Sequence, residues 1–129
     1  MATIELTDEN FAETVEHNNI VIIDFWADWC GPCKTFAPTF EKVSGNHEDI
    51  VFAKCDTEKE QMMASQFGIK SIPTLAILRE KVLLLSQAGV LPESALEDII
   101  SQVRALDMKA VHAAMAEEQE KAGNPSGEE

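Results

Sequence analysis

Two cysteines separated by two residues, Cys30 and Cys33, follow closely on a run of apolar residues. Thiol–disulfide exchange needs a thiolate that attacks a disulfide and a second thiol that resolves the mixed disulfide. At the start of a helix, the backbone dipole and the unpaired N–H groups favour a negatively charged sulfur. We therefore expect Cys30, at a helix N-terminus, to be the attacking nucleophile and Cys33, one turn inside, to be the shielded resolving thiol.

Asp24 lies in the middle of the apolar run 20–26, where water should be scarce. A buried carboxyl is costly unless it is hydrogen-bonded, paired or protonated. One interpretation is that the run is only half buried and that Asp24 faces water. The other, which its mostly apolar neighbours favour, is a desolvated carboxyl below Cys33 that takes the proton of this thiol as it attacks.

A pair of cysteines at this spacing could also be half of a zinc site. The other half could come only from Cys55 with His47, or from carboxylates, because no second close-spaced ligand pair is present. The flanking residues fit redox chemistry better, since Pro32 limits the backbone between the sulfurs and Trp29 offers a flat apolar surface to a substrate chain. We therefore expect no metal site.

The elements that must hold these residues alternate between strands and helices. The run 20–26 is typical of a central strand buried on both faces, and the cysteines lead from it into a helix. β-α-β units imply parallel pairing with right-handed crossovers, and a late hairpin adds antiparallel strands. The expected fold is a three-layer α/β/α sandwich on a mixed central sheet. The other expected strands cover 3–6, 50–56, 75–78 and 82–85.

Two local patterns in these elements carry their own predictions. Thr57 and Glu60 fit a capping box, which predicts that a helix begins directly after Thr57. In the hairpin, only Arg79, Glu80 and Lys81 separate the two strands, and they lack the Gly or Asn that a tight primed turn prefers. The sequence therefore leaves the geometry of this turn open.

The length of 129 residues favours one compact domain, expected over 1–108, with a further helix over 109–122 and a disordered acidic tail over 123–129. No apolar stretch approaches the roughly 18 residues of a membrane span. The net charge of −13 argues against nucleic acid and anionic membranes as partners. The first residues show no secretory signal, so we expect a cytoplasmic location.

Several motifs follow one another in a definite order along the chain: Asp24-Phe25-Trp26-Ala27, Trp29-Cys30-Gly31-Pro32-Cys33-Lys34, Pro38, Lys54, Ile72-Pro73-Thr74 and Gly89. Together they resemble the thioredoxin family, and the resemblance extends from about residue 3 to residue 108. It implies that Cys30 and Cys33 form a redox-active disulfide. It also implies that Asp24 assists Cys33, with Lys54 as the charged neighbour of this carboxyl.

The same resemblance implies a docking surface beside the cysteines. Pro73 would be in cis, which X-Pro bonds permit at modest cost, and would face the disulfide. The backbone of Ile72 would pair with an extended substrate segment. The substrate-binding set implied in this way comprises Trp29, Gly31, Pro32, Ile72, Pro73 and Gly89.

The implied activity is that of a protein-disulfide reductase, which passes two electrons from its dithiol to target disulfides. It would act in electron transport and cell redox homeostasis as a monomer without a bound cofactor. A thioredoxin reductase would restore the dithiol, so NADPH and FAD would take part only through that partner. An alternative is a redox-assisted chaperone, or holdase, or an interaction module with the same fold. An oxidase or isomerase is disfavoured by Gly31 and Pro32, which resemble the reducing members.

Three features lie outside the family pattern: Cys55, the turn at Glu80 and Lys81, which replaces the usual Gly-containing one, and the chain after residue 108. Cys55 is expected to be a buried core thiol, with a regulatory or dimer-forming thiol as the alternative. The helix after residue 108 is expected to pack loosely on the body, and the alternative is a partner-docking segment with Met108, Val111 and Met115 as its contact stripe. The histidines are scattered and expected to be solvated: His17, His47 and His112.

Overall fold

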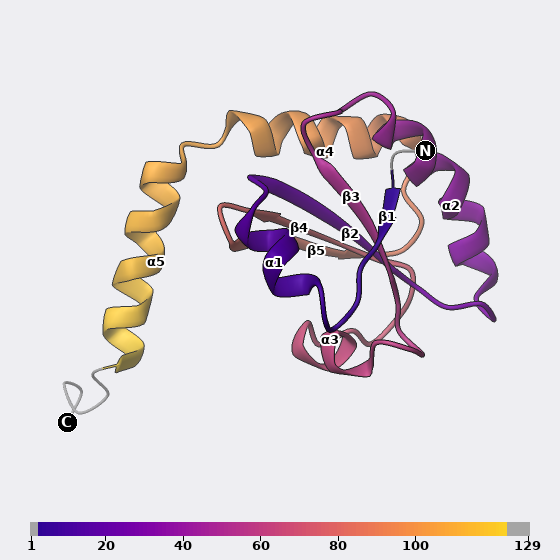
Figure 1. Cartoon of the computed structure of the whole chain (residues 1–129). Coiled ribbons are helices and arrows are strands. Elements are labelled where there is room, and N and C mark those ends of the chain that lie inside the picture. Colours follow the sequence, from indigo (N-terminus) through magenta and orange to yellow (C-terminus); the bar gives the residue numbers. More distant parts are fainter. Residues whose placement is uncertain (1–2, 124–129) are drawn as a thin grey trace. The chain divides into compact units, whose positions relative to one another are not determined.

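The computed structural model describes residues 3–123, and these form five strands and five helices (Figure 1). The strands are β1 (Thr3–Glu5), β2 (Ile20–Trp26), β3 (Val51–Asp56), β4 (Thr74–Arg79) and β5 (Val82–Ala88). The helices are α1 (Phe11–Glu16), α2 (Gly31–Ser44), α3 (Gln61–Gln66), α4 (Glu93–Ala105) and α5 (Met108–Gly123).

The strands form one mixed sheet in the order β1-β3-β2-β4-β5 (Figure 1). β1 and β2 run parallel to β3, whereas β4 pairs antiparallel with β2 and β5 antiparallel with β4. Helices cover both faces of this sheet. The predicted α/β/α fold on a mixed sheet is therefore confirmed.

β2 is the central strand, and its residues from Ile20 to Phe25 are buried. One phase of the strand, which includes Ile23, packs in a core cluster with Val15 of α1 and Met63 of α3. Alternate residues of a strand point to opposite faces, so the two faces of β2 need separate partners. Burial on both faces explains why the run is continuously apolar rather than alternating.

The opposite phase of β2 faces α2. Ile22 is the register partner of Phe52 on β3, and the ring of Phe52 lies 5.3 Å from that of Phe40 in α2. Asp24 follows Ile22 by two residues, so its side chain lies on this same face. The buried acid and the helix that begins at the cysteines are therefore on one side of the sheet.

The capping-box prediction at Thr57 is wrong. α3 begins at Gln61, and the hydroxyl of Thr57 instead donates to the carbonyl oxygen of Trp26 at 3.2 Å. The carboxylate of Asp56 accepts from the backbone N–H of Glu58 at 2.9 Å, which closes a turn in front of the helix. The hydroxyl of Thr57, which the local pattern predicted to cap a helix, thus bonds to the distant strand β2 instead.

The hairpin between β4 and β5 is present, and its turn is of the primed type. Glu80 and Lys81 have φ values of 52° and 70°, as both central residues of a type I′ turn require. Two contacts link these residues to other parts of the chain. The backbone N–H of Glu80 donates to the carbonyl oxygen of Asn19 at 2.8 Å, and the ammonium of Lys81 pairs with Glu16 at 3.0 Å.

By its contacts, the chain divides into two compact units, one up to Ile99 and one from Ile100 onward. The first carries the sheet, α1, α2, α3 and the start of α4. In the second, α5 covers the stretch for which a further helix was expected. The expected domain boundary at residue 108 stays a prediction, and 124–129 of the expected tail lie outside the described residues. None of the described helices is long and apolar enough to cross a membrane.

Candidate active site

Cys30 lies between the end of β2 and the start of α2. Its backbone is extended, with φ −93° and ψ 108°, so it is the N-cap of the helix, and Pro32 lies in the first turn. The sulfur of Cys30 accepts a hydrogen bond from the backbone N–H of Cys33 at 3.1 Å. A helix N-terminus stabilises negative charge, and here its N–H group points at the sulfur. The environment of Cys30 therefore favours a thiolate in the reduced protein.

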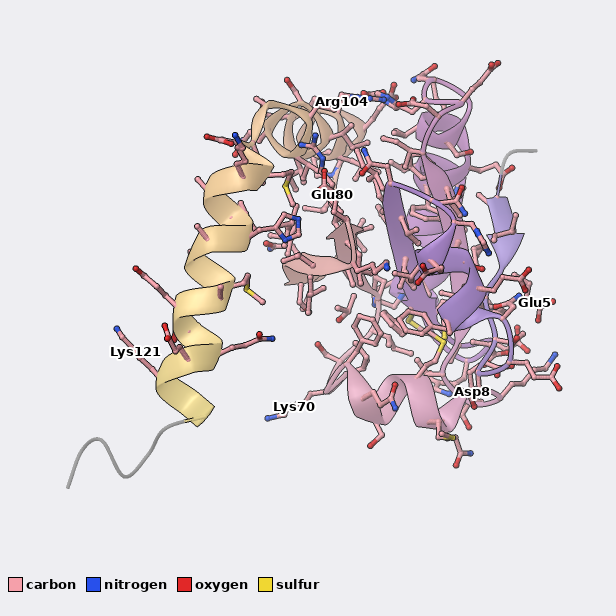
Figure 2. All side chains as sticks on the ribbon, turned by 60° about the vertical axis from the view of Figure 1, so that its left-hand side comes forward. Glu5, Asp8, Lys70, Glu80, Arg104 and Lys121 are labelled. Atoms are coloured by element: carbon pink, nitrogen blue, oxygen red, sulfur yellow. A yellow bond between two sulfur atoms is a disulfide. The ribbon has the colours of Figure 1, made fainter. Side chains whose placement is uncertain are left out.

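Cys30 and Cys33 form a disulfide, so the structure shows the oxidised form (Figure 2). Both side chains are almost fully buried, at 2% and 3% exposed, so exposure does not separate an accessible thiol from a shielded one. Their position does. Cys30 lines a cavity of about 590 Å³, and Cys33 is not among the lining residues. An incoming group in this cavity would meet Cys30 before Cys33.

The cavity beside Cys30 is formed by four separate parts of the chain. Four of its residues belong to the predicted substrate-binding set, namely Trp29, Gly31, Pro32 and Ile72. The other lining residues were not predicted from the sequence to belong to the site: Thr57, Ala64, Ile69, Lys70 and Ser71. Three of these directly precede Ile72 in the chain, and this proximity was an available signal. For Thr57 and Ala64 the sequence offered none.

The loop before β4 and the chain just after β5 bring two more predicted residues to the site, Pro73 and Gly89. The peptide bond between Ile72 and Pro73 is cis, as expected, and the carbonyl oxygen of Ile72 lies 3.6 Å from the sulfur of Cys30. The backbone N–H of Gly89 donates to the carbonyl oxygen of Pro73 at 2.8 Å. Gly89 has φ 103°, a value that favours glycine. Pro73 and Gly89 thus adjoin the site, but of these three residues only Ile72 lines the cavity itself.

Trp29 is the most exposed large apolar side chain that the structure describes, at 69%. Its indole N–H donates to the carboxylate of Glu58 at 3.2 Å. This bond fixes the edge of the ring at the cavity while its apolar face stays open to solvent. Glu58 was not predicted as a site residue, because nothing in its local pattern indicated a contact with Trp29.

Asp24 is fully buried, which excludes the interpretation that it faces water. Neither of its carboxylate oxygens has a hydrogen-bond partner among the described residues. The nearest cation is the ammonium of Lys54, 4.0 Å from one oxygen and 5.2 Å from the centre of the Trp26 ring. Burial raises the pKa of Asp24 from 3.8 to about 6, and the charge of Lys54 opposes the rise. A carboxyl with such a pKa can exchange a proton near neutral pH.

Cys55 and His47, the candidate metal ligands, do not come together. Cys55 is a free thiol buried in the core, with its sulfur 3.9 Å from that of Met63. His47 is largely buried and lies 2.7 Å from the carboxylate of Glu97, so the expectation that it is solvated is wrong. In the part of the chain that the structure describes, no group of three or more His, Cys, Asp or Glu side chains could hold a metal ion.

The family model described as Thioredoxin matches residues 2–102 of the chain. The chain belongs to the thioredoxin family. It is 55% identical over 122 residues to a putative thioredoxin 2 of Streptomyces coelicolor, and the match covers 95% of this chain and 91% of that relative. A thioredoxin of Bacillus subtilis is 38% identical over 104 residues, which cover 79% of this chain and 98% of the relative.

A solved thioredoxin structure supports the same assignment. The crystal structure of a thioredoxin from Malassezia sympodialis matches with a TM-score of 0.71 and 30% identity, covering 78% of this chain and 89% of that one. Thioredoxins carry no bound cofactor, so the electrons of the reaction reside in the cysteine sulfurs. In this thioredoxin-family chain, Cys30 and Cys33 are the redox-active pair, and the activity is that of a thiol–disulfide reductase.

Proposed function

We propose that the chain reduces disulfides in target proteins, with Cys30 as the attacking residue and Cys33 as the resolving one. The observation that supports this most strongly is the position of the Cys30 sulfur. It accepts the N–H of Cys33 at the start of α2, and Cys30 lines the cavity, whereas Cys33 does not. Thiolate stabilisation and access to substrate therefore coincide at one sulfur.

The proposed cycle begins from the dithiol. The Cys30 thiolate attacks one sulfur of the target disulfide, and the other target sulfur leaves as a thiolate. The thiol of Cys33 then loses its proton to Asp24, attacks the sulfur of Cys30 and displaces the second target thiolate. Two electrons have passed to the target, and Cys30 and Cys33 are left as a disulfide. Asp24 suits this role because it lies on the α2 face of the sheet and its raised pKa lets it hold the proton.

The target segment is proposed to lie against Ile72 and Trp29. The carbonyl oxygen of Ile72 is 3.6 Å from the Cys30 sulfur, so an extended segment hydrogen-bonded there would bring its own sulfur close to Cys30. The exposed indole of Trp29 would cover the apolar part of the segment. Gly31, Pro32, Pro73 and Gly89 complete the proposed binding surface, since each adjoins this junction in the chain or through a hydrogen bond.

Return to the dithiol is proposed to occur through a thioredoxin reductase that draws electrons from NADPH through FAD. The chain would then carry electrons between this reductase and its targets as a monomer, in a reducing compartment such as the cytoplasm. The free thiol of Cys55 is compatible with such a compartment.

The test traps the intermediate. With the Cys33→Ser variant, attack by Cys30 should leave a stable mixed disulfide with insulin whose disulfides are intact. This product should be visible on a non-reducing gel and confirmed by its mass. Cys30→Ser should form none, and Cys55→Ser should reduce insulin at a rate within about twofold of the unaltered chain when NADPH and a thioredoxin reductase are supplied. Trapping by Cys30→Ser instead of Cys33→Ser would reverse the assigned roles, and trapping by neither would refute the cycle.

A further inference from the structure

Three charged side chains lie side by side across the parallel part of the sheet. In the register of β1, β3 and β2, Glu5 is the partner of Lys54, and Lys54 is the partner of Asp24. Neighbouring strands are about 4.8 Å apart, and register partners project their side chains to the same face. An acid, a base and a second acid therefore form one row that ends at the proposed proton acceptor.

The row passes from solvent into the core. Glu5 is exposed at the edge strand β1, where Figure 2 labels it. The side chain of Lys54 is 28% exposed, and Asp24 is fully buried. Glu5 and Lys54 also line one cavity of about 320 Å³. The long, flexible side chain of Lys54 thus has an acid on each side and space in which to move between them.

The ammonium of Lys54 is not bound tightly to Asp24. Its nitrogen is 4.0 Å from the nearest carboxylate oxygen, which is beyond hydrogen-bond distance, and it lies over the Trp26 ring. An ammonium that moved in to bond Asp24 would stabilise the ionised carboxyl and make it a poorer proton acceptor. A competing acid on the solvent side would counteract that movement.

We propose that Glu5 is a positioning residue for the Lys54 ammonium, drawing it toward the edge of the sheet and away from Asp24. Glu5 touches neither substrate nor the reacting sulfurs, so it would act on the reaction only through Lys54. The inference deepens the proposed function, because it matters for catalysis only if Asp24 accepts the proton of Cys33.

The other groups that face Asp24 leave Lys54 as the side chain through which Glu5 can act. The register partner of Asp24 on β4 is Leu75, which carries no charge. α2 buries Cys33, Phe36 and Phe40, of which only Cys33 can ionise, and it is held in the disulfide of the oxidised form. Among the charges of the residues that the structure describes, that of Lys54 acts on the pKa of Asp24, and it opposes the effect of burial.

The test measures the pKa of Asp24 in the oxidised full-length chain by a carboxyl ¹³C NMR titration. Glu5→Gln should lower this pKa by about half a pH unit, because the ammonium is released toward Asp24. Glu9→Gln also removes an exposed acid and is the matched control; it should shift the pKa by less than about 0.2. No shift with Glu5→Gln, or a rise, would overturn the proposal.

A second background separates positioning from the direct field of Glu5. In a Lys54→Met chain, the effect of Glu5→Gln should fall to less than half of its value in the unaltered chain. Equal shifts in both backgrounds would show that Glu5 acts on Asp24 without Lys54 and would refute the inference. Because the oxidised protein turns over no substrate, these outcomes do not depend on whether Asp24 serves as the proton acceptor.

Discussion

Cys30 and Cys55 are buried to the same degree but lie in opposite chemical environments. Cys30 is 2% exposed and Cys55 is 0% exposed. The sulfur of Cys30 faces a backbone N–H at a helix N-terminus, and Cys30 lines a cavity of about 590 Å³. The sulfur of Cys55 lies near the end of β3, 3.9 Å from the sulfur of Met63. Burial alone therefore does not decide which thiol is reactive.

The difference lies in what each burial site offers to a negative charge. Burial raises the pKa of the Cys55 thiol to about 12, and the nearby carboxylates of Glu60, Asp8 and Asp56 add to the rise. At Cys30 the backbone dipoles of α2 act in the opposite direction. A thiol becomes a nucleophile where the fold supplies N–H donors and a path for the substrate, and it stays inert where the fold supplies apolar contacts and nearby negative charges.

The largest expected effect is on alkylation of the reduced protein. At pH 8, iodoacetamide should modify Cys30 at least about 1,000-fold faster than Cys55, because a thiol of pKa about 12 is ionised to roughly one part in ten thousand at that pH. Peptide mapping by mass spectrometry at a series of times gives both rates. The denatured chain is the control, since there the two thiols should react alike. Comparable rates in the folded protein would remove the contrast between the two sites.

Replacing Asp24 by Asn should raise the free energy of unfolding of the oxidised protein at pH 7 by about 3 kcal/mol. This value follows from the difference between the pKa of the Asp24 carboxyl in the unfolded chain, 3.8, and in the folded chain, about 6. Because the folded pKa is the higher one, the folded state binds more protons between these values. Stability contributed by this carboxyl is therefore lost as pH rises from about 4 to 6 and stays lost above that range.

Urea unfolding at pH 4 and pH 7 tests this, because the advantage of Asp24→Asn should be large at pH 7 and small at pH 4. The same variant should reduce insulin more slowly, since the amide cannot accept the proton of Cys33. Asp28→Asn, a change of the same type at an exposed position, is the matched control. An equal gain at both pH values would mean that the carboxyl is not the source of the effect.

Cys55→Ser should lower the free energy of unfolding by about 1–3 kcal/mol, because a hydroxyl would replace a weakly polar thiol in an apolar core. Cys55→Ala should cost less, since it leaves only a small void and no unpaired polar group. Denaturant unfolding of both variants gives the order. If Ser were tolerated better than Ala, the site would be more polar than its contacts indicate, and the contrast with Cys30 would weaken.

The sequence was sufficient for the parts of the site that are local in the chain. The strand that carries Asp24, the helix that begins after Cys30 and the order of the remaining elements follow from hydrophobic periodicity and from the spacing of the cysteines. The resemblance to the thioredoxin family added the cis bond before Pro73, which the structure contains. Each of these features depends on residues close together in sequence or on a motif that the family shares.

What the sequence missed are contacts between distant segments. Thr57 matches a capping box, but its hydroxyl bonds the end of β2, 31 residues away. His47 looked solvated because its partner, Glu97, is 50 residues away. Glu80 and Lys81 are not the usual residues of a primed turn, yet they adopt one, in which the backbone N–H of Glu80 bonds to Asn19 and Lys81 pairs with Glu16. A prediction from a local pattern fails when the same group forms its hydrogen bond or ion pair with a distant residue instead.

The smallest expected effect separates docking of the target from reactivity of the thiol. Glu58→Ala removes the acceptor of the Trp29 indole N–H, so the ring should lose its fixed position at the cavity. A lost hydrogen bond of about 1 kcal/mol predicts a roughly threefold to fivefold drop in kcat/KM for a protein disulfide. Alkylation of Cys30 by iodoacetamide should stay unchanged, because this small reagent does not need the indole.

Glu48→Ala, which removes an exposed acid outside the cavity lining, should alter neither rate. If Glu58→Ala slowed both reactions equally, Glu58 would act on the sulfur itself, and docking and thiol activation would not be separate properties of this site.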